Sequence, residues 1–213
     1  MDRFQFAIAV LGCRTNQDEF DALRSVLLGM GGEEVGFPGP ADLVLVNSCA
    51  VTASAQAKSR KEIRKAGRIK QGGFLIVTGC AAQADPAGLA RLEGVDLVLG
   101  NRAKTNLPHI LKRVLSGEGL AKERAESSRS GAALISWEAD ATVERFISRS
   151  GPIPARRSRP TLKIQDGCPF RCSFCIVPHL RGDPRSRDPG EVLREARRLA
   201  EAGMHEIVLT GIN

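Results

Sequence analysis

The chain has 213 residues, of which 42% are hydrophobic, and this is enough for one or two domains with a buried core. No stretch reaches the roughly 20 apolar residues that a membrane helix requires, and the N-terminus lacks the pattern of a signal peptide, so we expect a cytoplasmic protein without a membrane partner. The net charge of +7 favours a polyanionic partner such as a nucleic acid.

The first half alternates short apolar runs with amphipathic stretches, which is the pattern of a parallel α/β sheet. In chain order we expect strands at 6–12, 42–47, 73–79 and 95–100, and helices at 17–31, 52–70, 85–94 and 107–115. Thr52 or Ser54 is expected to cap the second helix, which is strongly basic. The sequence thus predicts an α/β domain over residues 1–117, with an open parallel sheet and flanking helices.

Three cysteines follow predicted strands at nearly the same place: Cys13 the first, Cys49 the second and Cys80 the third. The carboxyl ends of parallel strands share one edge of the sheet, where ligands commonly bind. Ordinary burial is the alternative, because free cysteine is a common core residue. These cysteines lie beyond the apolar runs, however, beside glycine or serine, and this favours one shared site.

Residues 118–159 break the α/β pattern, because they are rich in Ser, Arg, Gly and Pro. We interpret them as a linker with short strands around 132–138 and 142–147. The pattern resumes with a strand at 161–166, a helix at 188–203 with Pro189 in its first turn, and a strand at 205–211. Residues 160–213 are therefore predicted to begin a second domain with one βαβ unit.

The start of this second domain contains the run CPFRCSFC, with cysteines at positions 168, 172 and 175. In a reducing cytosol clustered cysteines more often bind metal than form disulfides. A zinc site with His179 as the fourth ligand is one alternative, and an electron-transfer protein with closed clusters is another. Three thiolates on a four-iron cluster leave one iron open for a substrate or cofactor.

The loop CPFRCSFC, placed after a strand, resembles the signature of the radical S-adenosylmethionine (SAM) enzymes. The stretches LGCRTNQ, NSCAVTASAQAKSRKEIRK, VTGC and CIVPHLRGDPRSR are similar to the methylthiotransferases of that superfamily. GCRTNQDE, CAVT and QDGC are most similar to the branch that acts on threonylcarbamoyladenosine in tRNA. The branches for isopentenyladenosine in tRNA and for a ribosomal-protein aspartate are the competing interpretations.

The resemblance implies two [4Fe-4S] clusters and bound SAM. Cys168, Cys172 and Cys175 would hold the catalytic cluster, which reduces SAM to start radical chemistry at C2 of the modified adenine. The other triplet, Cys13, Cys49 and Cys80, would hold an auxiliary cluster that supplies or relays sulfur. Among the remaining residues, Phe174 matches a family position near the SAM adenine, and Gly211 would contact its methionine group. The family also implies an electron donor such as flavodoxin or ferredoxin.

The expected macromolecular partner is tRNA, at its anticodon loop, rather than DNA. Arg181, Arg185 and Arg187 follow the cysteine loop closely, and we expect them to hold the RNA backbone. The basic helix at 52–70 is either a further RNA surface or a simply solvated face. Because the family's barrel has more strands than residues 160–213 supply, the chain is expected to be a fragment or truncated product, inactive by itself.

Overall fold

The structure, a computed structural model, describes residues 3–115, 134–136, 146–154 and 158–212. Its larger part is a parallel sheet with the strand order β2-β1-β3-β4-β5-β6. These strands are β1 (Phe4–Val10), β2 (Gly32–Glu34), β3 (Ala41–Ser48), β4 (Lys70–Gly79), β5 (Leu97–Leu99) and β6 (Leu134–Ser136). The predicted α/β class with an open parallel sheet is confirmed.

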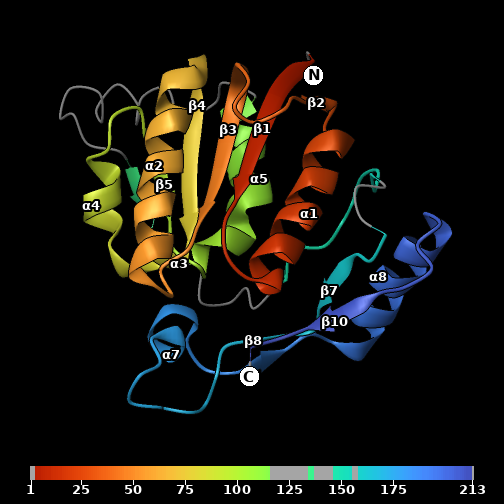
Figure 1. The fold of residues 1–213 in the computed structure, drawn as a ribbon. Coiled ribbons are helices and arrows are strands. Elements are labelled where there is room, and N and C mark those ends of the chain that lie inside the picture. Colours follow the sequence, from red (N-terminus) through yellow and green to blue (C-terminus); the bar gives the residue numbers. More distant parts are fainter. Residues whose placement is uncertain (1–2, 116–133, 137–145, 155–157, 213) are drawn as a thin grey trace.

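Helices cover both faces of this sheet (Figure 1). They are α1 (Arg14–Gly29), α2 (Ala53–Ile69), α3 (Cys80–Ala84), α4 (Pro86–Ala90), the 3-10 helix η1 (Ala103–Asn106) and α5 (Leu107–Leu115). Apolar side chains of α1 and α5 share one core with every second residue of the strands, and those of α2, α3 and α4 share the other. Each large apolar side chain that is fully buried contributes about 1.5–3 kcal/mol.

Local sequence explains where several elements begin. The hydroxyl of Thr52, one of the two predicted caps, accepts a hydrogen bond from the Ala55 amide at the start of α2. The predicted helix at 85–94 is present as the shorter α4, which Asp85 caps, and it is preceded by α3, a short helix that was not predicted and that ends at the same Asp85. Single polar residues, Thr52 and Asp85, therefore set where helices of the N-terminal part begin or end.

The second part is smaller and begins with β7 (Thr161–Lys163). Along the chain there follow β8 (Gln165–Asp166), α7 (Val177–Arg181), β9 (Arg185–Ser186), α8 (Pro189–Glu201) and β10 (Val208–Thr210). Strands β7 and β10 pair in parallel around α8, which is the predicted βαβ unit, while β8 and β9 form a short antiparallel pair. In Figure 1 this part lies against one end of α1.

Three features differ from the sequence-based expectation. Strand β2 was not predicted, because its three residues carry no apolar run and it forms by pairing with β1. Strand β6 lies in the predicted linker but pairs with β5 and so belongs to the N-terminal sheet. The strand predicted at 142–147 falls mostly outside the described residues. Among the described residues, no helix is long and apolar enough to cross a membrane.

Candidate cluster sites and the junction between them

The first cysteine triplet lies at the carboxyl edge of three neighbouring strands. Cys13 follows β1, Cys49 follows β3 and Cys80 begins α3 directly after β4. In the sheet register Val10 is opposite Asn47, and Asn47 is opposite Thr78. The three cysteines therefore stand three, two and two residues beyond one common rung. Cys13 is exposed, whereas Cys49 and Cys80 are buried.

Glycine shapes two of these turns. Gly12 has φ +105°, and a Cβ added there would lie 3.3 Å from the Cys49 Sγ, so the first turn passes directly beside the second cysteine. Gly79 has φ +98°, and a Cβ there would lie 2.3 Å from the Ser48 carbonyl oxygen. Only glycine allows the chain to reach Cys80 so close to the neighbouring strand.

Hydrogen bonds hold the turn that contains Cys49. Its amide donates to the Ser59 hydroxyl at 2.9 Å, and that hydroxyl donates back to the Cys49 carbonyl at 3.1 Å. The Ser48 hydroxyl in turn donates to the Thr78 carbonyl at 2.6 Å and accepts from the Ala82 amide at 3.2 Å. Helices α2 and α3 thus fix the backbone around Cys49 and Cys80.

The second triplet lies on the loop between β8 and α7. The Cys168 amide donates to the Gly182 carbonyl at 3.1 Å, which closes the loop, and the Cys175 amide donates to the Cys172 carbonyl at 3.0 Å. Cys172 is exposed, and Cys168 and Cys175 are partly exposed. An open hollow of about 370 Å³ is lined by Arg171, Cys172, Ser173, Phe174, Cys175, Ile176 and His179. The Phe174 side chain is 90% exposed beside this hollow.

Each triplet consists of three free cysteines, and this donor set suits an iron-sulfur cluster. Among the described residues, no three His, Cys, Asp or Glu side chains gather closely enough to hold one metal ion. A four-iron cluster is wider than one ion and takes thiolates that stand further apart. Cysteine sulfur is also the soft ligand that such clusters select. Each triplet could therefore hold a cluster through its three cysteines.

Helix α7 connects the two triplets. It begins two residues after Cys175 and packs against α3, whose first residue is Cys80. Leu180 of α7 belongs to the same apolar cluster as Cys49 and Cys80. The Asn101 side-chain amide donates to the Leu180 carbonyl at 2.8 Å and lies 3.9 Å from the Cys80 Sγ. The helix that follows the second triplet therefore packs beside the end of the sheet that carries the first triplet.

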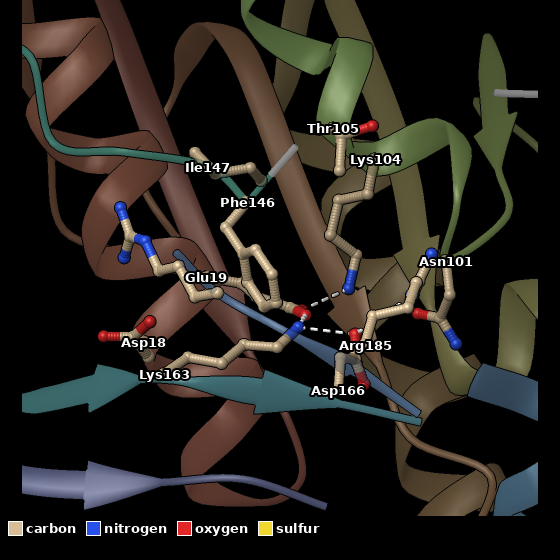
Figure 2. Close-up of a pocket in the computed structure, with 11 residues that line it drawn as sticks. Asp18, Glu19, Asn101, Lys104, Thr105, Phe146, Ile147, Lys163, Asp166 and Arg185 are labelled. Atoms are coloured by element: carbon tan, nitrogen blue, oxygen red, sulfur yellow. Dashed lines mark hydrogen bonds and ion pairs between the residues drawn. The ribbon is translucent and has the colours of Figure 1, made fainter. Parts of the chain in front are cut away.

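A buried cluster of charges lies where α1 meets the second part (Figure 2). Both Lys104 and Lys163 place Nζ 2.5 Å from the Glu19 carboxylate, and the Arg181 Nη1 lies 3.1 Å from it. Asp166 accepts from Lys163 at 2.5 Å and from Arg181 at 3.0 Å. Arg181 also donates to the Asn16 side chain. We call these six residues the junction cluster: Asn16, Glu19, Lys104, Lys163, Asp166 and Arg181.

The pKa values in the junction cluster reflect its mixed charges. Burial alone would raise the pKa of Glu19, but the charges of Lys104, Lys163 and Arg181 outweigh burial and hold this pKa well below its usual range. For Asp166, burial is likewise outweighed by Lys163 and Arg181, which lower its pKa. Burial lowers the pKa of Lys104, against the attraction of Glu19.

A second ion-pair group links α1 to α8. Arg149 places Nη2 2.8 Å from the Asp18 Oδ1 and Nη1 2.9 Å from the Glu195 Oε1, and it donates to the Thr161 carbonyl at 3.1 Å. All three charged side chains are at most 4% exposed. Burial raises the pKa of Asp18 despite the opposing charge of Arg149. Charged contacts thus join the two parts of the structure at two places.

The structure gives the three arginines after the cysteine loop different surroundings. Arg181 lies buried in the junction cluster, and Arg187 is buried near Ser148 and Glu195. Only Arg185 is partly exposed, with its Nη2 3.7 Å from the Asp166 carboxylate. Arg181 and Arg187 therefore have structural contacts that the sequence analysis did not predict. Gly211 follows β10 and lies beside the Gln165 side chain, which accepts from the Ile212 amide at 2.7 Å.

Sequence reasoning missed the acidic side of the junction. Asp18 and Glu19 were considered only within a predicted helix and the motif GCRTNQDE, and Asp166 only within QDGC. No ion pair was predicted for these residues or for Lys104 and Lys163. One signal was present, because Glu19 falls on the same helical face as Leu23, four residues later, which is buried. A carboxylate on an apolar face indicates a buried ion pair.

Two family models match the chain. Residues 5–100 match the uncharacterized protein family UPF0004, and residues 162–213 match the Radical SAM superfamily. The chain is 36% identical to the threonylcarbamoyladenosine tRNA methylthiotransferase MtaB of Bacillus subtilis, over 97% of this chain and 43% of that protein. It is 34% identical to the ribosomal protein uS12 methylthiotransferase RimO of a Roseiflexus species, over 96% of this chain and 45% of that protein.

A solved structure shares the fold. The radical SAM methyltransferase TsrM from Kitasatospora setae, with tryptophan and a SAM analogue bound, matches with a TM-score of 0.59 at 16% identity, over 97% of this chain and 47% of that one. The chain spans under half the length of the curated relatives it matches. With a UPF0004 segment followed by a Radical SAM segment, the chain is similar along nearly its whole length to radical SAM methylthiotransferases.

Proposed function

We propose that this chain carries the two cluster-binding parts of a tRNA methylthiotransferase, which inserts a methylthio group at C2 of N6-threonylcarbamoyladenosine next to the anticodon. The observation that supports the proposal is the contact of α7, the helix that follows one cysteine triplet, with α3, which begins with Cys80 of the other. Two relatives at 35–36% identity bear the threonylcarbamoyladenosine name and so favour this substrate.

The proposed cluster ligands are the six cysteines, in the two triplets that the sequence predicts. Cys168, Cys172 and Cys175 would hold one [4Fe-4S] cluster together with SAM, and Cys13, Cys49 and Cys80 would hold the other. When bound, these groups supply one-electron chemistry and the sulfur for insertion. The chain's own residues position them: Ser59 fixes the turn of Cys49, and the Gly182 carbonyl fixes the backbone at Cys168.

The surroundings of the second triplet suit SAM. The exposed ring of Phe174 beside the hollow offers a flat apolar surface on which an adenine can stack. Gly211 follows β10, which pairs with β7 just before the cysteine loop, and a methionine group could contact its backbone there. Exposed Cys172 lies where an electron donor such as flavodoxin or ferredoxin could approach.

RNA binding would use exposed basic side chains near the cysteine edge. Arg185 is partly exposed after the loop, and α2 carries a row of exposed cations that starts beside the turn of Cys49. These are Lys58, Lys61, Arg64, Lys65 and Arg68. Folded RNA is bound mainly through phosphates and shape, which such a row suits. We also propose a cytoplasmic location and a division into residues 1–117 and 160–213, joined by residues 118–159, of which β6 belongs to the N-terminal sheet.

Iron content tests the cluster sites directly. The purified chain, reconstituted anaerobically with iron and sulfide, is expected to bind about eight irons, which is two four-iron clusters. Replacing Cys13, Cys49 and Cys80 with alanine should leave about four irons, and replacing the other triplet should do the same. Stoichiometric zinc without iron would contradict the proposal and favour the zinc interpretation.

Mass spectrometry of tRNA tests the substrate. In cells that lack the full gene, the methylthio group should disappear from threonylcarbamoyladenosine and remain on isopentenyladenosine. The RimO relatives at similar identity make the ribosomal protein the second candidate. Loss of methylthiolation from that protein alone would move the assignment there.

A further inference from the structure

The carboxylate of Glu19 lies at the meeting point of three chain segments. Lys104 comes from η1 on the N-terminal sheet, Lys163 from the end of β7, and Arg181 from the end of α7. Figure 2 shows Glu19 between Lys104, which approaches from η1, and Lys163, which extends from β7. Among the described residues, one buried carboxylate thus receives cations from both parts of the structure.

The junction cluster flanks both cysteine triplets in sequence. Asn16 is three residues after Cys13, and Asp166 is two residues before Cys168. Arg181 ends the helix that follows the second triplet, and the same helix packs on α3, which begins with Cys80. A shift of Arg181 relative to α1 would therefore move one triplet relative to the other.

The charge balance makes Glu19 the critical member. Its carboxylate and that of Asp166 face four cations, of which Lys104 belongs to the N-terminal sheet, whereas Lys163, Arg181 and the more distant Arg185 belong to the second part. Without the charge of Glu19, Lys104 would repel Lys163 and Arg181 across the boundary. Buried charges repel strongly because water does not screen them. The expected result is an opening between α1 and α7 rather than general unfolding.

We propose that Glu19 is a positioning residue that fixes the loop of Cys168, Cys172 and Cys175 against the sheet edge of Cys13, Cys49 and Cys80. Glu19 acts through its ion pairs with Lys163 and Arg181. The inference rests on the proposed function only because it takes the two triplets as cluster sites. The role is electrostatic, because the same carboxylate attracts cations that would otherwise repel one another. Contacts between side chains, of which the junction cluster is one, join the two parts because β7 and β10 do not join the N-terminal sheet.

The first test uses the chain without clusters. In Glu19→Gln, hydrogen exchange should become at least tenfold faster for the amides of α7 and β7, while the amides of β3 and β4 keep their wild-type rates. Glu206→Gln is the matched control, since it removes a carboxylate from an exposed ion pair with Arg159 at 3.7 Å. If hydrogen exchange became equally faster throughout the sheet, Glu19 would have only a general structural role and the proposal would be overturned. Unchanged exchange rates in α7 would also overturn it.

The second test measures position in the reconstituted chain. Reduced clusters held near each other broaden each other's electron paramagnetic resonance signals, and this broadening should weaken in Glu19→Gln at unchanged iron content. Glu19→Asp keeps the charge and should retain most of the broadening. If Glu19→Gln folds poorly, the broadening in Glu19→Asp still tests the role of the charge. Wild-type-like broadening in Glu19→Gln would refute positioning by Glu19. A wild-type chain that binds fewer than about eight irons would instead count against the proposed function.

Discussion

Replacing Arg149 with methionine tests how strongly charge holds the two parts together. The side chain keeps its approximate length but loses the ion pairs to Asp18 and Glu195 at 2.8 and 2.9 Å. Because only 2% of the Arg149 side chain is exposed, removing it leaves two carboxylates buried without their principal partner. Loss of one partner of a buried pair costs about 3–5 kcal/mol, which is a large share of the roughly 5–15 kcal/mol that stabilises a typical domain.

Urea unfolding at neutral pH measures the cost of Arg149→Met, and Arg159→Met is the control. Arg159 lies 3.7 Å from Glu206 in a pair that is more than half exposed, so its loss should cost less than about 1 kcal/mol. A loss for Arg149→Met that is no larger than that of the control would refute the claim that buried charge joins α1 to α8.

The pH dependence of Arg149→Met gives an independent readout. Burial already raises the pKa of Asp18, and without Arg149 this pKa should rise further. A carboxyl whose folded pKa is raised contributes stability at low pH, and this contribution is lost as the pH rises through the folded pKa. The variant should therefore regain stability relative to wild type when the pH is lowered from 7 towards about 5. A constant difference across that range would contradict the burial of Asp18.

Three further predictions concern the junction, the turns and the RNA surface. The pKa values of Glu19 and Asp166 are held below the usual range, so the stability that these carboxylates contribute is present above about pH 4 and is lost as the pH falls through their folded pKa values. In Glu19→Gln, the free energy of unfolding measured with urea should therefore depend less on pH in this acid range. An unchanged pH dependence would contradict the prediction. Gly79→Ala should destabilise the fold by more than Gly203→Ala. Both glycines have positive φ, but only at position 79 would the added Cβ clash, with the Ser48 carbonyl oxygen. Equal decreases of the melting temperature in the two variants would show that the clash is relieved. Glutamine in place of the exposed α2 cations should weaken binding to an anticodon stem-loop, measured by fluorescence anisotropy. The slope of log binding constant against log salt concentration should become shallower by about 0.7 for each phosphate that is no longer neutralised. An unchanged slope would show that the row is a solvated face. The residues replaced are Lys58, Lys61, Arg64, Lys65 and Arg68.

The sheet and the edge positions of its cysteines could be predicted because both depend on local patterns. Apolar runs mark the strands, and a cysteine just after each run reaches the carboxyl edge whatever the rest of the chain does. The position of Cys13, Cys49 and Cys80 on adjacent strands needed only the rule that parallel strands share one edge. The edge strand β2 could not be found in this way, since pairing with β1 creates it.

The junction cluster could not be predicted because its partners are distant in sequence. Glu19 and Arg181 are 162 positions apart, and Glu19 and Lys163 are 144 apart. A basic run shows charge but does not show whether carboxylates from another segment will meet it. For this reason the sequence placed Arg181 on an RNA surface, whereas the structure places it in the interior.

The charged junction also suits the chemistry proposed for this chain. Apolar packing at a boundary tolerates sliding, because dispersion and burial depend weakly on direction. A carboxylate held by two lysines and a guanidinium has far fewer arrangements that satisfy every hydrogen bond, so it fixes the register of the two parts at some cost in desolvation. Transfer of sulfur between two sites depends on their separation more than on the total stability of the fold. A junction made of Glu19, Lys163 and Arg181 therefore favours a defined separation over maximal stability.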